Sequence, residues 1–165
     1  MSTGKTRKKI NKKKKSKFNI KIIKLNSLLS SLSTAQSRKL AKLVFGWCLD
    51  HLGENFRKKH KDLEIQLDYT PKIDYYGEYF IEEDIRLIKI FMNHNKTVKD
   101  FISSGLHEYV HDMLPDTKYD VLYKKYGYKN HPHEKKANKI ANNFTLICWE
   151  DIRFKLNNQI CKNRS

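Results

Sequence analysis

The segment Thr97–Leu114 constrains the fold most, because it predicts an amphipathic helix with a defined start and a defined end. Thr97 and Asp100 have the spacing of a capping box, in which two side chains satisfy free N–H groups of a first turn. Pro115 closes the segment. Apolar residues recur between these limits at i, i+3 and i+4 spacing: Val98, Phe101, Ile102, Leu106, Val110 and Met113. This apolar face can anchor the helix to the rest of a domain.

The other periodic segments predict an α+β domain with a small three-stranded sheet. A second capping box, Ser33–Gln36, begins a long helix that we expect to run to about Lys58. Three consecutive segments are typical of strands and favour an antiparallel or mixed sheet: Leu63–Tyr69, Glu78–Ile81 and Ile85–Met92. Pro132 lies in the first turn of a last helix, which we expect to continue past Trp149. The domain is therefore predicted to span residues 31–158, followed by a polar tail at residues 159–165.

Residues 1–30 are strongly basic and predict a disordered tail. The chain carries a formal net charge of +16, and residues 1–17 contain no acidic side chain. Blocks of like charge repel one another and usually stay unfolded. Nucleic acids and anionic lipid heads are natural partners of such a segment. Two roles remain open, a solubility or targeting arm and a nucleic-acid-binding segment made of Lys8, Lys9, Lys12, Lys13, Lys14 and Lys15.

Cysteine usage and hydropathy argue against a secreted or membrane-spanning protein. The three cysteines contain no CxxC pair, so neither a disulfide framework nor a cysteine zinc site is indicated. Lys21 and Lys24 interrupt the apolar residues after the basic start, and we therefore expect no secretory signal. No apolar run has the length of a transmembrane helix. These features predict an intracellular protein, either cytoplasmic or, in a eukaryote or its virus, nuclear.

The sequence His107-Glu-Tyr-Val-His111 lies within the helix predicted for residues 97–114. Histidines four residues apart lie one turn above each other, so both imidazoles can bind one zinc ion at about 2.0–2.1 Å. Glu108 then projects beside the metal, where it can act as a general base. The alternative is that all three are ordinary surface residues, because so short a pattern also arises by chance. The cap, the helical period and the preceding strand are the context that the motif requires, and they favour a metal site.

A catalytic zinc site needs a third protein ligand and an open fourth position for water. Three residues near the start of the last helix are candidates: His131, His133 and Glu134. We favour Glu134, because it lies in the first turn of that helix. Ala137 and Ala141 behind it allow the helix to pack closely against the HExxH helix. In the competing interpretation, Glu134 only complements the helix N-terminus, where carboxylates are common.

The pattern resembles that of the gluzincin metallopeptidases, which have HExxH on one helix and a ligand glutamate on the next. The resemblance covers roughly the second half of the chain and is nearest to the compact ImmA and IrrE type peptidases. It implies a zincin-like fold, Glu108 as the general base, and the strand from Ile85 as the edge that pairs with a substrate peptide. Asn138 replaces an aspartate that orients a zinc histidine in many gluzincins, and its amide oxygen can accept the same imidazole N–H. The zinc ligands implied by the resemblance are His107, His111 and Glu134.

A second resemblance, to the SprT-type peptidases, leaves the third ligand open. Those proteins share the small size and basic character of this chain but use a third histidine, which here would be His131 or His133. This alternative changes the ligand set and the substrate, and it keeps the chemistry of the site.

Both resemblances predict a zinc-dependent peptidase that hydrolyses a protein or peptide substrate through a metal-activated water. An additional donor usually stabilises the oxyanion of such a reaction. Tyr126 and Tyr128 are candidates, as are Tyr123 and His133, because all four lie between the two ligand-bearing segments. The alternative function is nucleic-acid binding by the basic tail, with a zincin-like domain that is catalytically inactive.

Overall fold

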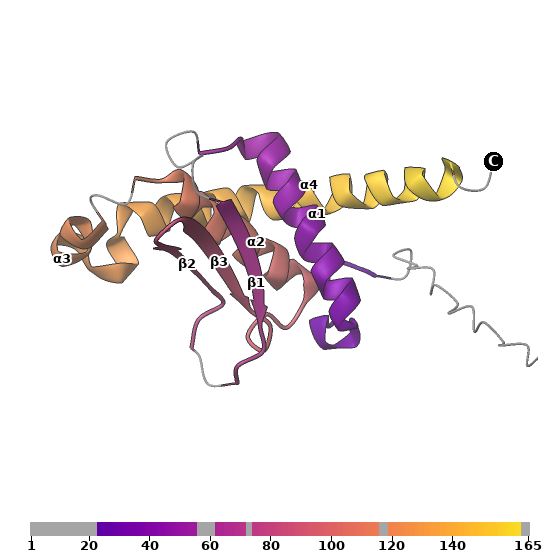
Figure 1. Cartoon of the computed structure of the whole chain (residues 1–165), viewed down its shortest axis with the longest axis horizontal. Coiled ribbons are helices and arrows are strands. Elements are labelled where there is room, and N and C mark those ends of the chain that lie inside the picture. Colours follow the sequence, from indigo (N-terminus) through magenta and orange to yellow (C-terminus); the bar gives the residue numbers. More distant parts are fainter. Residues whose placement is uncertain (1–22, 56–61, 72–73, 116–118, 163–165) are drawn as a thin grey trace, which may run out of the picture.

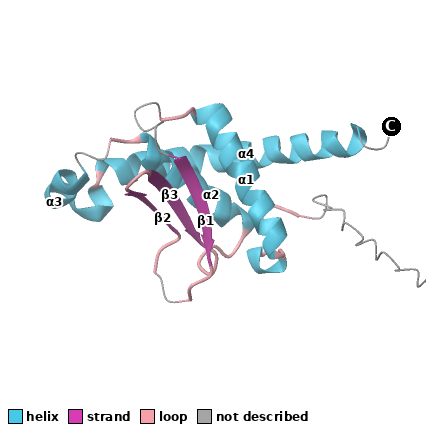
Figure 2. Cartoon of the chain, in the orientation of Figure 1, coloured by secondary structure: helices cyan, strands magenta, loops and turns pink. Residues whose placement is uncertain are grey.

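The computed structural model describes residues 23–55, 62–71, 74–115 and 119–162, with side chains up to residue 155. Figure 1 shows the arrangement of the elements, and Figure 2 shows the sheet as a small part of a mainly helical molecule. The elements are the 3-10 helix η2 (Leu29–Ser31), α1 (Thr34–Leu52), β1 (Asp62–Asp68), β2 (Gly77–Glu82), β3 (Ile85–Phe91), α2 (Val98–Met113), α3 (Tyr119–Asn130) and α4 (Pro132–Lys162). The predicted α+β class is therefore confirmed.

The three strands form a mixed sheet in the order β1-β3-β2. A tight turn at Glu83 and Asp84 joins β2 to β3 as an antiparallel hairpin, and β1 pairs with β3 in parallel. Strand β3 is therefore central, and β1 and β2 are the edges. The prediction that the strand from Ile85 is a free edge is wrong, because both sides of β3 are already paired. The edge that lies next to α2 is β2.

Helix α2 lies at the centre of the core. It packs against β2 and β3, against α1 and against α4. Its predicted cap is confirmed, since Thr97 Oγ1 accepts from the Asp100 N–H at 3.1 Å and Asp100 Oδ2 accepts from the Thr97 N–H at 2.9 Å. The core contains almost fully buried residues from α2 and from three elements around it: Phe101, Ile102, Leu106 and Tyr109 of α2, Val44 and Trp47 of α1, Ile88 and Ile90 of β3, and Trp149 and Ile152 of α4.

Helix α1 begins as predicted and ends earlier than predicted. Its capping box is present, with Ser33 and Gln36 exchanging hydrogen bonds of 2.8 and 3.3 Å. The helix stops at Leu52, because Gly53 has a φ of 82° in the left-handed region and cannot continue it. The predicted extension of this helix is therefore wrong for residues 53–55. Residues 56–61, which include the predicted end at Lys58, lie outside the described part of the chain.

Residues 23–32, most of which belong to the segment predicted as a tail, lie against the domain. Leu29 is buried in the core. The Ser27 carbonyl accepts from the Val98 N–H at 3.0 Å, and the Leu25 carbonyl accepts from the Lys99 N–H at 2.9 Å. This segment therefore satisfies two N–H groups of the first turn of α2 that have no partner within the helix. The predicted nucleic-acid-binding lysines Lys8, Lys9 and Lys12–Lys15 lie outside the described residues.

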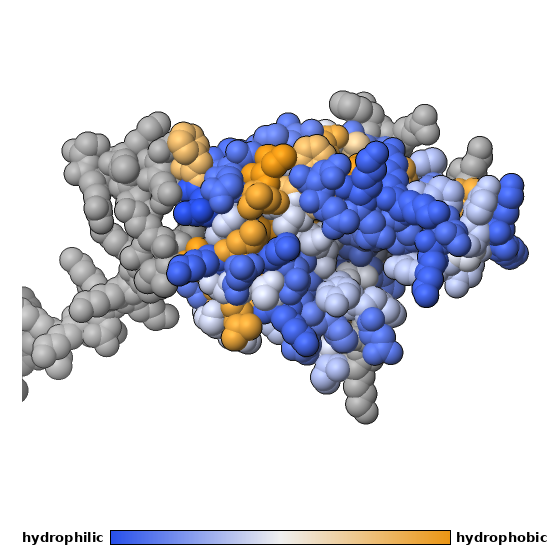
Figure 3. Space-filling model, turned by 180° about the vertical axis from the view of Figure 1, so that it is seen from behind, coloured by the Kyte–Doolittle hydropathy of each residue, from blue (hydrophilic) through white to orange (hydrophobic). Residues whose placement is uncertain are grey.

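The surface is largely hydrophilic. Seen from behind, it carries a strip of hydrophobic residues and a few smaller hydrophobic patches between wide hydrophilic areas (Figure 3). Helix α4 extends beyond the other elements toward the C-terminus (Figure 1), and Leu146, Ile147 and Phe154 on it are exposed. Within the described part of the chain, no helix is both long enough and apolar enough to cross a membrane.

Candidate metal centre

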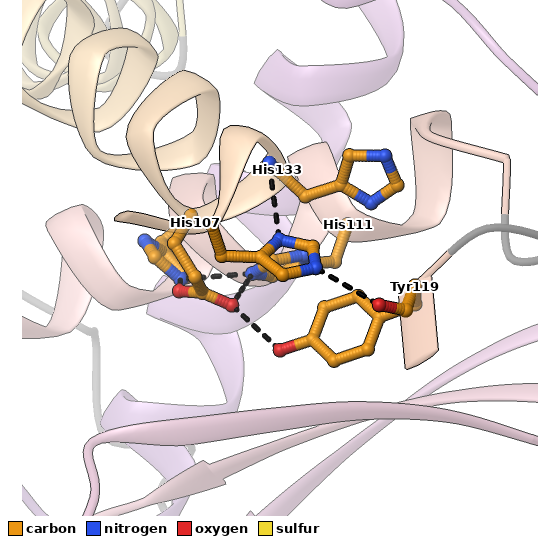
Figure 4. Close-up of polar contacts among 6 residues, drawn as sticks. His107, His111, Tyr119 and His133 are labelled. Carbon is orange, nitrogen blue, oxygen red and sulfur yellow. Dashed lines mark hydrogen bonds and ion pairs between the residues drawn. The ribbon is translucent and has the colours of Figure 1, made fainter. Parts of the chain in front are cut away.

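Helix α2 presents His107 and His111 side by side, one turn apart. Their Nε2 atoms are 3.0 Å apart and their ring centroids are 4.7 Å apart (Figure 4). The opposite side of the helix is held by the core, and its last turn is held by Asp112. The Asp112 carboxylate lies fully buried and accepts from Arg86 of β3 at 2.9 Å. The two imidazoles therefore extend from a helix that is held by its buried face and by the ion pair at its last turn.

Glu134 of α4 completes a cluster with these histidines. Its Oε2 atom lies 3.2 Å from His107 Nε2, and its Oε1 atom lies 3.3 Å from His111 Nε2. The approach is close because Ala137, one turn further along α4, packs in a buried cluster with Val110 of α2. A larger side chain at residue 137 would push the two helices apart.

The donor set fits a zinc ion. The ligand atoms of His107, His111 and Glu134 all lie within 4.8 Å of one another. Ligand atoms about 2.0–2.1 Å from a tetrahedral zinc ion are about 3.3 Å from each other. The two histidine Nε2 atoms are 3.0 Å apart, and Glu134 lies 3.2 and 3.3 Å from them through its two different oxygens. Glu134 is only 5% exposed, and its Oε2 atom faces His107 Nε2 at 3.2 Å instead of solvent. A buried carboxylate oxygen of this kind is well placed to bind a cation.

The charges of the cluster also favour a cation. Burial alone would raise the pKa of Glu134, but hydrogen bonds with His107 and His111 outweigh it and hold that pKa far below its ordinary value. Burial lowers the pKa of His107, but the hydrogen bond to Glu134 and the nearby carboxylates raise it further than burial lowers it. Glu134 is therefore ionised, and the two imidazoles face a negative charge.

Glu108 lies beside this cluster in the same pocket. It is 7% exposed, and burial raises its pKa to about 7, although His107 and His111 act in the opposite direction. Gly77, the first residue of β2, lies against it so closely that an added Cβ would be 2.7 Å from Glu108 Cγ. This contact joins residues that are distant along the chain, so no local sequence pattern predicts it.

A pocket of about 660 Å³ opens over these side chains. One wall is formed by residues 77–81 of β2. The other lining residues come from the loop before β2 and from the three helices around the cluster: Asp74, Tyr75, His107, Glu108, His111, Tyr119, Tyr128, His133 and Glu134.

The two alternative third ligands lie apart from the donor cluster. His131 is fully buried, and both of its ring nitrogens contact the backbone. His133 lines the pocket, and its ring packs 6.0 Å from that of Tyr119 (Figure 4). Within the described residues, the group that could hold a metal contains neither of them. Asn138, the predicted partner of a zinc histidine, does interact with His107, and this hydrogen bond contributes to the raised pKa of His107.

The tyrosines between the ligand-bearing helices differ in their positions. Tyr128 lines the pocket, and burial together with the charge of Glu134 and a hydrogen bond to it raises the pKa of Tyr128. Tyr126, by contrast, is exposed beneath the Lys125 ammonium group and is not among the residues that line the pocket. Tyr123 is also exposed, and its ring stacks on that of Tyr119 at 6.5 Å.

Tyr119 is a site residue that sequence analysis did not single out. Its hydroxyl group donates to Glu134 Oε1 at 3.1 Å (Figure 4). It lies at the start of α3, a helix that the sequence did not predict. None of the residues of α3 is buried, so the apolar stripe that would indicate a helix is missing. The only signal was the run of tyrosines itself.

In comparisons with protein families, with curated proteins and with solved structures, nothing matches this chain. The site's own geometry is therefore the basis for assigning a function.

Proposed function

We propose that this protein is a zinc-dependent peptidase with a zincin-like fold, in which His107, His111 and Glu134 hold the metal and Glu108 is the general base. The observation that carries the proposal is the position of Glu134. It comes from a different helix than the HExxH residues, yet its two carboxylate oxygens lie 3.2 and 3.3 Å from the two histidine Nε2 atoms. If the HExxH pattern had arisen by chance, we would not expect a buried carboxylate from another helix beside its two histidines.

The side chains around the cluster fit the steps of amide hydrolysis. A bound zinc ion supplies a Lewis acid that acidifies water and polarises a carbonyl oxygen. Glu108 is buried next to the ligands, and a nearby cation favours its ionised form. As a carboxylate, it accepts a proton from the attacking water and passes it to the leaving amine. Tyr128 and His133 line the same pocket and are the residues placed to donate to the oxyanion.

Strand β2 supports a peptide as the substrate. It is an edge of the sheet, and residues 77–81 form one wall of the pocket. An extended peptide can add to such an edge through main-chain hydrogen bonds, which recognise the backbone rather than a particular side chain. A peptide bound along β2 would pass directly over Glu108 and the histidines. This role replaces the one that was expected of the strand from Ile85.

The proposed ligand set is gluzincin-like and not SprT-like, since the side chain beside the two histidines is the carboxylate of Glu134 on α4 and neither His131 nor His133. The nucleic-acid-binding alternative depends on lysines outside the described residues, and no described contact supports it. It therefore stays a prediction, and it is compatible with a peptidase domain.

Glu108→Gln tests the proposed activity most simply. The amide keeps the size of the side chain but cannot accept the proton, so hydrolysis of quenched fluorescent peptides should fall by about 10²–10⁴-fold. Zinc content should stay unchanged, because Glu108 is not one of the ligands. Glu64→Gln, at an exposed position of β1 outside the pocket, is the matched control and should keep full activity. A fully active Glu108→Gln variant, or zinc-loaded wild type that cleaves no peptide, would contradict the proposal.

A further inference from the structure

His131 lies between α3 and α4 and is the one histidine of this region that is completely buried, with 0% exposure. Its Nε2 atom lies 3.1 Å from the Tyr119 carbonyl oxygen, and its Nδ1 atom lies 3.2 Å from the His133 backbone nitrogen. Its ring also packs on the Tyr119 ring, with centroids 4.2 Å apart. A fully enclosed imidazole with both nitrogens engaged calls for a role other than filling space.

The two hydrogen bonds define the tautomer of His131. The His133 backbone N–H can only donate, so Nδ1 must be the acceptor and carries no proton. The Tyr119 carbonyl can only accept, so Nε2 must carry the proton. His131 is therefore a neutral imidazole protonated at Nε2. Neither nitrogen has a lone pair left for a metal, which explains why this residue is not a ligand.

The Nδ1 contact makes His131 the N-cap of α4. Its carbonyl oxygen accepts the first hydrogen bond of the helix, from the Lys135 N–H at 3.0 Å, while its side chain satisfies the His133 N–H. Pro132, between them, has no N–H to satisfy. In a common capping box, a glutamate at the position of Glu134 would turn back toward the backbone of the cap. With His131 as the cap, Glu134 turns instead toward His107 and His111.

The Nε2 contact connects His131 to the same glutamate by a second route. It holds the backbone of Tyr119, whose hydroxyl group donates to Glu134 Oε1 at 3.1 Å. One buried imidazole thus fixes the start of the helix that carries Glu134 and the tyrosine that restrains its carboxylate. We propose that His131 is a positioning residue that orients Glu134 for metal binding, acting through the α4 cap and through Tyr119. This inference rests on the proposed role of Glu134 as a ligand.

Three substitutions separate the two routes. His131→Asn retains a good N-cap and loses the N–H that reaches the Tyr119 carbonyl. His131→Ala loses both the N-cap and the N–H that reaches the Tyr119 carbonyl. Tyr119→Phe removes only the hydroxyl group that bonds to Glu134. His51→Asn is the matched control, because His51 also bonds to a backbone carbonyl, that of Trp47, but lies at the end of α1 outside the pocket.

The measurements are zinc affinity by competition with a chelator, the absorption spectrum of the Co²⁺-substituted protein, and the melting temperature of the metal-free protein. We expect His131→Ala to lower zinc affinity by about 10–100-fold, the usual effect of losing a group that orients a metal ligand. His131→Asn should retain part of the lost affinity. Tyr119→Phe should lower affinity to a similar extent as His131→Asn, and both should change the Co²⁺ spectrum. The control should match wild type in affinity and spectrum.

The double variant His131→Asn/Tyr119→Phe tests the mechanism directly. If His131 acts through Tyr119, the double variant binds zinc no more weakly than Tyr119→Phe alone, because the route is already broken. Additive losses would overturn that route. Metal affinities and Co²⁺ spectra equal to wild type in folded His131→Asn and Tyr119→Phe proteins would overturn the inference while leaving the proposed function intact. Failure of wild type itself to bind metal would refute both.

Discussion

Gly77 leaves room for the side chain of Glu108 because it has no side chain of its own. A Cβ at this position would lie 2.7 Å from Glu108 Cγ and 2.8 Å from Glu108 Oε1. Cγ is close to the backbone of α2, so it cannot move away as freely as the end of the side chain. Gly77→Ala should therefore displace Glu108, the proposed general base, without contacting the proposed metal ligands.

We expect Gly77→Ala to reduce kcat by about 10²-fold, since displacements near 1 Å at a catalytic group have effects of this size. Zinc content should stay at the wild-type level. Gly46→Ala is the control, because an added Cβ at residue 46 of α1 meets nothing within 4 Å. An unchanged kcat in a zinc-loaded Gly77→Ala protein would show that the contact does not position Glu108.

The raised pKa of His107 predicts how metal binding depends on pH. Its pKa lies above the ordinary value of 6.5, since the hydrogen bond to Glu134 and the neighbouring carboxylates outweigh the effect of burial. Zinc binds the neutral imidazole, so protons compete with the metal below this raised pKa. Glu134 has a lowered pKa and stays ionised over the same range. Zinc affinity should therefore fall on acidification from a higher pH than that at which a free imidazole titrates. Competition titrations from mildly alkaline to mildly acidic pH test this, and an affinity that stays constant would contradict it.

At the scale of elements, Arg86 and Asp112 tie the central strand to the HExxH helix. Both side chains are almost fully buried, and Arg86 Nη1 lies 2.9 Å from Asp112 Oδ2. Removing one member leaves the other charge buried with less compensation, which costs about 3–5 kcal/mol. Arg86→Leu should lower the free energy of unfolding of the metal-free protein by about this amount, measured by urea denaturation.

The double variant Arg86→Leu/Asp112→Leu serves as the comparison for this ion pair. It removes both charges, and we expect it to be more stable than Arg86→Leu alone. If the single variant unfolds at the same urea concentration as wild type, the pair does not hold α2 on the sheet.

The elements that the sequence predicted well have local signals. Helix α2 has a capping box, a continuous apolar face and a closing proline, and its bounds matched. The end of α1 was missed because Gly53 adopts a left-handed conformation that residue type alone only suggests. The parallel pairing of β1 with β3 depends on contacts between residues far apart in the chain, so alternation within each strand could not reveal it.

The residues of the candidate site also divide into those with a local sequence signal and those that depend on contacts between distant parts of the chain. His107, Glu108 and His111 follow from one helical turn, and Glu134 follows from its place in the first turn of a helix with small residues behind it. The positions of Tyr119 and His131 depend on α3, which has no buried face and is interrupted at Gly127, where φ is 63°. Their roles become visible only in three dimensions.

At the scale of the whole molecule, the pocket differs in charge from the rest of the chain. The chain has a net charge of +16, yet the residues described as lining the pocket include four carboxylates and no lysine or arginine: Asp74, Glu78, Glu108 and Glu134. Carboxylates concentrated in a partly enclosed space attract cations, including a divalent metal. A metal bound there would also link α2 to α4, the two helices that supply its ligands. A metal at the proposed site would therefore contribute to the stability of the fold as well as to its chemistry.

The number of zinc ions bound per chain shows whether His107, His111 and Glu134 hold a metal ion. Wild type should contain about one zinc per chain, and removal of the third ligand in Glu134→Ala should lower the content well below this value. Glu64→Ala, which removes an exposed glutamate of β1, should keep the wild-type content. A full equivalent of zinc in Glu134→Ala, or wild type that binds no zinc, would contradict the proposed metal site.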